Sequence, residues 1–146
     1  MNRTRFACSA GLLLVAAFTT HAAPLPKEIR RGDHIQIVGT WKLVESGSGT
    51  AALKAGDGSS WQFDAEGKAA IIRADGKIDG GIKFTIDPNE NPKQFDWMPN
   101  WGNYRGCYTL EGDKLVLYLR SGDKENRVRE AKQAANVEVY SFERAK

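Results

Sequence analysis

The sequence predicts an all-β protein folded as an eight-stranded antiparallel up-and-down barrel. Three observations lead to this prediction. Apolar and polar residues alternate with period two in run after run, clusters of Gly, Asp, Asn and Pro separate the runs, and helical periodicity is almost absent. The eight runs follow one another along the chain, and closing them into a barrel leaves no exposed strand edge.

The predicted strands are joined by segments rich in turn-forming residues. Asp75-Gly76 and Glu111-Gly112-Asp113 favour tight turns, because glycine adopts positive φ without steric cost. Residues 46–59 are mostly Gly, Ser, Ala and Lys and are predicted to form a flap, and a short helical turn is expected at 129–135. The strands themselves are predicted at 35–45, 60–64, 68–73, 78–87, 93–98, 104–110, 114–120 and 137–142.

The alternation also predicts which side chains face the barrel interior. Most of them are large, and an eight-stranded barrel is narrow enough for such side chains nearly to fill it. We therefore expect a filled core, with at most a shallow apolar pocket beneath the flap. The residues predicted to face inward are Ile37, Trp41, Leu43, Trp61, Phe63, Ile71, Ile82, Phe84, Ile86, Phe95, Trp97, Tyr108, Leu110, Leu115, Leu117 and Leu119.

The first residues indicate export. Arg3 and Arg5 form a basic start, residues 11–18 form a short apolar core, and small residues end the segment at Ala22. This order is typical of a cleaved signal peptide, and the core is too short to span a bilayer. A lipid-bearing cysteine would follow the apolar core, whereas Cys8 precedes it, so no membrane anchor is expected. We expect an exported protein, either periplasmic or secreted.

Three segments follow from this interpretation: a signal peptide at 1–22, a tether or capping turn at 23–34, and the barrel domain at 35–146. Removing 22 of the 146 residues leaves 124, the size of one domain. Without Arg3 and Arg5, 19 of the 21 basic residues remain against 18 acidic ones. A nearly neutral, mixed surface does not favour nucleic acid, and we expect a monomer.

Cys107 is then the single cysteine of the mature chain, so no intramolecular disulfide is available. It lies in a strand-like run, where a small buried hydrophobe is a better interpretation than a reactive thiol.

Gly39-Thr40-Trp41 at the head of the first run resembles the opening motif of the lipocalins. In that family the tryptophan plugs the closed end of the barrel, and an arginine from near the chain end stacks across it. The resemblance implies the same role for Gly39 and Trp41, with Arg144 as the first candidate for the arginine and Arg127 as the second. Such a cation–π contact is worth about 1 kcal/mol.

A closer resemblance is to an uncharacterised lipocalin-like family of bacterial exported proteins, and it spans nearly the whole mature chain. The likeness departs from the family at Val128, where a proline usually follows the arginine, and at Cys107, where a branched aliphatic residue is usual. The family has no known activity, so the likeness implies the fold and not a function. The matching motifs are Gly39-Thr40-Trp41, Trp61-Gln62-Phe63, Asp87-Pro88, Pro92-Lys93-Gln94-Phe95-Asp96 and the run from Gly106 to Leu115.

The sequence offers no catalytic constellation. His34 is the single histidine of the mature chain, which excludes a histidine-rich zinc site, and Asp87-Pro88-Asn89 lacks the spacing of a calcium loop. Asp96 is expected to face solvent and to pair with Lys93 or with a neighbouring strand. We therefore expect no enzyme activity, no metal and no cofactor; a hydrolase using exposed carboxylates such as Asp96 ranks last.

Two functions remain open. The first is a non-catalytic protein that binds a small apolar ligand at the barrel mouth, with Trp97, Trp101 and Tyr104 as contact residues. The second is a structural or protein-interaction module with a filled core, in which Trp101 contacts an envelope protein, because a tryptophan in a loop is costly to leave in water.

Overall fold

The computed structural model describes residues 32–146. The predicted signal peptide at 1–22, with Cys8, and residues 23–31 of the predicted tether lie outside the described residues. One short helix, α1 (Gly32–Gln36), precedes the strands, and a 3-10 helix lies at Lys124–Asn126. The strands are β1 (Gly39–Ser48), β2 (Lys54–Ala55), β3 (Ser60–Phe63), β4 (Lys68–Ile72), β5 (Ile78–Asp87), β6 (Gln94–Met98), β7 (Tyr104–Glu111), β8 (Lys114–Ser121) and β9 (Glu138–Arg144).

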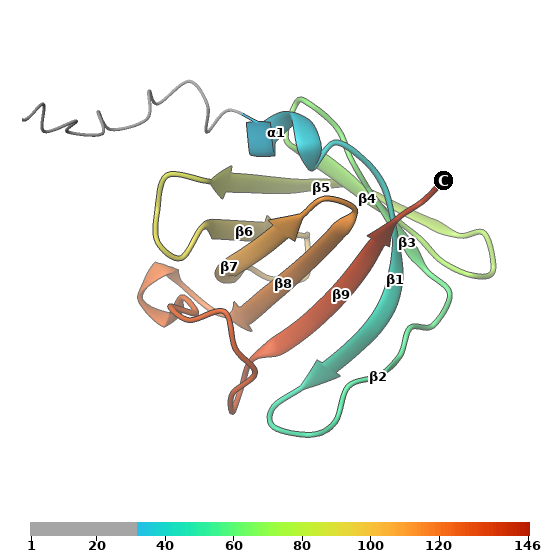
Figure 1. Cartoon of the computed structure of the whole chain (residues 1–146). Helices are drawn as coiled ribbons and strands as arrows, with labels where there is room; N and C mark the ends of the chain where they lie inside the picture. Colours follow the sequence, from blue (N-terminus) through green and yellow to red (C-terminus); the bar gives the residue numbers. More distant parts are fainter. Residues whose placement is uncertain (1–31) are drawn as a thin grey trace, which may run out of the picture.

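The strands form a closed barrel (Figure 1). From β3 to β9 each strand pairs antiparallel with the next in sequence, β3 pairs with β1, and β9 returns to β1. Leu43 of β1 lies opposite Phe142 of β9 at this seam. β2 is a two-residue addition that pairs with β1 outside the ring. The all-β, eight-stranded antiparallel up-and-down barrel predicted from the sequence is therefore confirmed, and it is compatible with a lipocalin-like fold.

Three local predictions differ from the structure. The predicted first strand includes Ile35, yet this residue belongs to α1 and is 77% exposed. The alternation of Ile35 and Ile37 fits period two, but Ile35 lies in the helical turn of α1 and Ile37 directly follows that helix. Residues 46–59 are not simply a flap, since β1 continues to Ser48 and Lys54 of β2 pairs with Ser46. The helical turn expected at 129–135 is replaced by the earlier 3-10 helix at Lys124–Asn126.

Aromatic rings fill the barrel interior from one wall to the other. Trp61 of β3 stacks on Trp97 of β6 with ring centroids 4.5 Å apart, and it also meets Phe142 of β9 at 5.1 Å. Phe63 lies edge-on to Phe84 at 4.9 Å. These strands are not neighbours in the ring, so the contacts cross the interior. Most side chains predicted to face inward are buried in this core, whereas Ile71, Ile86 and Leu110 are only partly buried against it.

A second, smaller core lies outside the barrel wall. Tyr108 faces inward, so its neighbour Cys107 faces outward, where it is fully buried by Val128 and Val137 of the segment 122–137 and by Val139 of β9. Burial raises the pKa of the Cys107 thiol to about 11. Cys107 is therefore a packed hydrophobe in this structure, beneath a segment that crosses the outer face.

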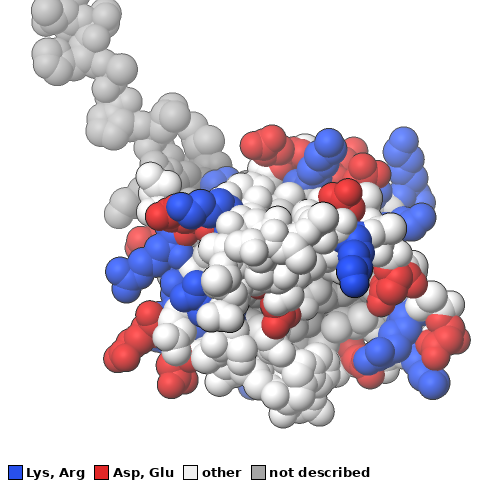
Figure 2. All heavy atoms as spheres, turned by 90° about the horizontal axis from the view of Figure 1, so that it is seen from below, with Lys and Arg blue, Asp and Glu red and all other residues white. Residues whose placement is uncertain are grey.

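The surface carries charges of both signs. In the view from below, Lys, Arg, Asp and Glu side chains lie mainly around the edge of the face, and most of its middle is uncharged (Figure 2). No helix within residues 32–146 is long and apolar enough to cross a membrane. Over the same residues, no group of three or more His, Cys, Asp or Glu side chains is placed to hold a metal ion.

Candidate functional site

Asp33 holds the N-terminal end of α1 against one end of the barrel. Its Oδ2 accepts hydrogen bonds from the Tyr108 hydroxyl and the Lys93 ammonium, both at 2.8 Å. The ammonium also lies 5.8 Å from the centre of the Tyr108 ring. Burial, and then the hydrogen bond to Asp33, raise the pKa of the Tyr108 phenol. A hydrogen-bonded carboxylate thus joins α1 to β7 and to the loop before β6.

The C-terminal end of α1 is held by Arg144, the last residue of β9. Its guanidinium lies over the Trp41 ring, 4.3 Å from the ring centre, and donates hydrogen bonds to the carbonyl oxygens of Val38, at 3.1 Å, and Gln36. Trp41 is fully buried, and its Nε1 donates to the Ile37 carbonyl at 2.7 Å. The structure therefore brings Trp41 and Arg144 together at the end of the barrel that α1 covers.

Gly39 makes this arrangement possible. Its φ is +129°, a conformation that side chains rarely allow, and a Cβ at this position would lie 3.0 Å from Nη1 of Arg144. A larger residue would push the guanidinium away from the carbonyls that it binds.

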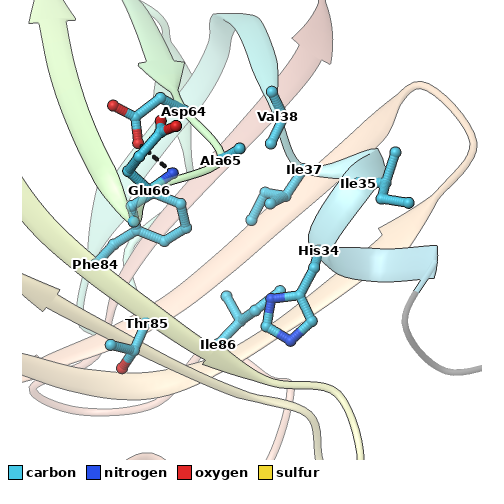
Figure 3. Close-up of a pocket in the computed structure, with 11 residues that line it drawn as sticks. His34, Ile35, Ile37, Val38, Asp64, Ala65, Glu66, Phe84, Thr85 and Ile86 are labelled. Atoms are coloured by element: carbon cyan, nitrogen blue, oxygen red, sulfur yellow. Dashed lines mark hydrogen bonds between the residues drawn. The ribbon is translucent and has the colours of Figure 1, made fainter. Parts of the chain in front are cut away.

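A groove of about 670 Å³ opens beside α1 at this end of the barrel (Figure 3). Its walls come from three separate parts of the chain: α1 with the two residues that follow it, the turn between β3 and β4, and β5. Ile37, Phe84 and Ile86 give it an apolar base, and Figure 3 places His34 on one side and Asp64 and Glu66 on the opposite side. The lining residues are His34, Ile35, Ile37, Val38, Asp64, Ala65, Glu66, Gly67, Phe84, Thr85 and Ile86.

The turn opposite α1 has a defined shape. Oδ1 of Asp64 accepts hydrogen bonds from the backbone N–H groups of Glu66, at 3.0 Å, and Lys68, at 2.7 Å. The Gly67 carbonyl in turn accepts a bond from the Phe84 N–H at 2.9 Å. The side chain of Asp64 therefore replaces turn hydrogen bonds locally and fixes one wall of the groove.

The chemistry of this lining favours binding. The base is aliphatic and aromatic, and the polar groups stand at the rim, an arrangement typical of small-molecule sites of about 300–1,000 Å³. His34 is the one histidine among the lining residues, and Thr85 is the one lining residue with a hydroxyl group.

The three residues predicted to contact a ligand or partner lie in different environments. Trp97 is 3% exposed and stacked inside the core, so it offers almost no surface to a molecule outside. Tyr104 is partly buried and packs against the same core. Trp101, in the loop between β6 and β7, is 55% exposed. Trp97 and Tyr104 lie opposite each other on β6 and β7, and of the three residues Trp101 offers the most surface to a ligand or partner.

Sequence reasoning missed the residues that build the groove. Asp33 and Tyr108 are 75 positions apart, and no local pattern links them. His34, for which the sequence predicts neither a catalytic nor a metal-binding role, lines the groove. The available signal was Asp33 itself, an acidic residue ahead of a short apolar run, which is common in the first turn of a helix.

Comparisons with protein-family models, with curated proteins and with solved structures found no match for this chain.

Proposed function

We propose that this protein is an exported, non-catalytic, lipocalin-like binding protein that takes a small apolar ligand in the groove beside α1. The observation that carries the proposal is the groove itself: about 670 Å³ of space over the apolar side chains of Ile37, Phe84 and Ile86. The rings of Trp61 and Trp97 stack on each other inside the barrel, 4.5 Å apart between centroids, so they are engaged with the core. The proposed ligand site is therefore at the end that α1 covers, opposite the barrel mouth expected from the sequence.

The groove favours a ligand with an apolar body and a polar end. Apolar surface buried against such a base contributes about 25 cal/mol per Å². His34 can donate or accept a hydrogen bond at one side, and Glu66 is exposed at the other, so a hydroxyl or amine of the ligand would find a partner at the rim.

A groove-filling variant tests the proposal. Ala65 lines the groove and is exposed, so Ala65→Phe adds a ring to the groove without entering the core. The matched control is Ala74→Phe, in the exposed turn between β4 and β5 at the other end of the barrel. Native mass spectrometry of protein purified from its host should show a bound small molecule in wild type and in Ala74→Phe. The occupied fraction should fall at least severalfold in Ala65→Phe.

A titration with medium-chain fatty alcohols gives a second readout. The methyl NMR signals of Ile37 and Ile86 should shift in a saturable way in wild type and not in Ala65→Phe. Absence of any bound molecule, together with unshifted methyl signals, would overturn the proposal.

A second function is favoured by one observation, the 55% exposure of Trp101. In this alternative the barrel is a protein-interaction module with a filled core, and the loop tryptophan contacts an envelope protein. A periplasmic pull-down with wild type and Trp101→Ala should then recover different partners, and identical partner sets would reject this alternative.

A further inference from the structure

Three charged side chains meet on the outer face of the barrel, away from the groove. Asp96 of β6 lies opposite Arg105 of β7, and Arg127 reaches it from the segment 122–137. Arg105 Nη1 is 3.0 Å from Asp96 Oδ2, and Arg127 Nη1 is 2.6 Å from Asp96 Oδ1. The three side chains are only 13–14% exposed. This pairing with a neighbouring strand agrees with the interpretation of Asp96 given above, while burial replaces the expected solvent exposure.

The cluster has more positive than negative charge. One carboxylate faces two guanidinium groups, and the remaining contact of Arg127 Nη1, at 3.1 Å, is to the uncharged Gly106 carbonyl. Nε of Arg105 and Oδ1 of Asp96 are both buried without a hydrogen-bond partner among the described residues, although Oδ1 lies 2.6 Å from Arg127 Nη1. Charge removed from water is costly unless a counter-charge compensates it, so this part of the surface favours an additional anion.

A hollow of about 290 Å³ opens directly beside the cluster. Its charged lining residues are Lys124, Arg127 and Arg129, and no acidic side chain lines it. Asn91 and Gln94 contribute amide groups that can donate hydrogen bonds. Neither Lys124 nor Arg129 forms an ion pair with an acidic residue within residues 32–146, and both are exposed.

A second hollow, of about 390 Å³, adjoins the first and shares Gln94, Lys124 and Arg127 with it. It is lined by Asp87 and Asp96 as well, so its charge is balanced, and it gives room for an uncharged part of a ligand. Guanidinium groups bind the two oxygens of a carboxylate or phosphate side by side, and an ammonium adds charge without direction.

We propose that the hollow lined by Lys124, Arg127 and Arg129 binds the carboxylate or phosphate group of a small organic anion. The hollow shares no lining residue with the groove beside α1, although the second hollow shares Thr85 and Ile86 with that groove, and the proposal does not depend on the function proposed for the groove. Because its three basic side chains come from the segment 122–137, a bound anion also holds that segment against Gln94 of β6 and the loop before it.

The test is an NMR titration of the folded protein with citrate, inorganic phosphate and glycerol 3-phosphate, against sodium chloride at equal ionic strength. The side-chain Nε–Hε signals of Arg127 and Arg129 and the amide signals of Gln94 should shift in a saturable way. Tighter binding of citrate would identify the bound group as a carboxylate, and tighter binding of inorganic phosphate and glycerol 3-phosphate would identify it as a phosphate.

Two variants locate the site. Lys124→Gln and Arg129→Gln remove charge from exposed positions and should each weaken binding about three- to tenfold, as expected for a charged hydrogen bond. Lys83→Gln, on the exposed face of β5 and outside both hollows, is the matched control and should bind like wild type. Equal thermal unfolding of all three variants would show that folding is not affected.

The proposal is overturned by either of two results. One is a lack of saturable shifts at Arg127 and Arg129 with all three anions. The other is equal weakening in Lys83→Gln, which would show general attraction to a charged surface and not a site.

Discussion

The guanidinium carbon of Arg144 lies 4.3 Å from the centre of the Trp41 ring, and the same side chain binds the carbonyl oxygens of Gln36 and Val38. We predict that Arg144→Ala lowers the free energy of unfolding by about 2–3 kcal/mol, because it removes a cation–π contact and leaves the partly buried Val38 carbonyl without this donor. Urea unfolding followed by tryptophan fluorescence measures the change.

The matched control is Arg73→Ala. Arg73 pairs with Asp79 on the surface, with a 57% exposed side chain, and such pairs contribute less than about 1 kcal/mol. Equal losses in the two variants would show that Arg144 has no special role at the closed end.

The hydrogen bond between Asp33 and Tyr108 predicts a coupled pair of variants. Asp33→Asn and Tyr108→Phe should each destabilise the fold by about 1–3 kcal/mol, and the double variant should cost clearly less than their sum, since both remove one interaction. Hydrogen exchange should also become faster at the Ile37 amide, which donates to the Asp33 carbonyl. If the losses in the free energy of unfolding simply add, Asp33 and Tyr108 stabilise the fold independently of each other.

Alkaline pH should destabilise the protein in a way that depends on Cys107. The folded thiol keeps its proton up to a pKa of about 11, whereas the unfolded thiol ionises near its ordinary 9.0. The unfolded chain therefore binds fewer protons in this window, and the free energy of unfolding falls as pH rises, by about 2 kcal/mol. The raised pKa values of Tyr108 and Tyr140 extend the fall above pH 10.0.

Denaturant unfolding at several pH values measures this dependence. In Cys107→Ala the fall between about pH 9 and pH 11 should be shallower, even if the variant is less stable overall, because the slope reports proton binding and not packing. If the free energy of unfolding falls with pH as steeply in Cys107→Ala as in wild type, Cys107 is not the cause of the fall.

Trp97 and Trp101 should respond oppositely to truncation. Trp97→Ala opens a cavity beside Trp61 and should cost about 3–5 kcal/mol, whereas Trp101→Ala should change stability by no more than about 0.5 kcal/mol. Fluorescence quenching by iodide checks the same point, because Trp101→Phe should remove most of the quenchable signal. A wild-type-like quenching curve in Trp101→Phe would place an accessible tryptophan elsewhere.

The strands were predictable because their pattern is local. Ile82, Phe84 and Trp97 follow period two, and each is buried in the core as that period requires. The same alternation places the Trp97 side chain inside the barrel. Its prediction as a contact residue relied instead on its closeness to Trp101 in the sequence. In the structure Trp97 is buried, as the alternation requires.

The groove and the outer cluster were not predictable because they depend on distant partners. Arg127 was considered for the position over Trp41, and it instead meets Asp96 on the outer face. Alternation tells which face of a strand a residue occupies but not which loop covers that face. For the same reason the burial of Asp96, beneath residues 122–137, has no signature in its own strand.

The seam between β1 and β9 also bears on how the protein is made. β9 is the last strand of the described residues, and it pairs with β1, the strand that begins at Gly39. During synthesis β9 leaves the ribosome after β1 to β8, so the ring cannot close until β9 has emerged. Until then β1 and β8 each keep an unpaired edge to which a strand of another chain can add. Emergence of β9 therefore removes both edges in one step.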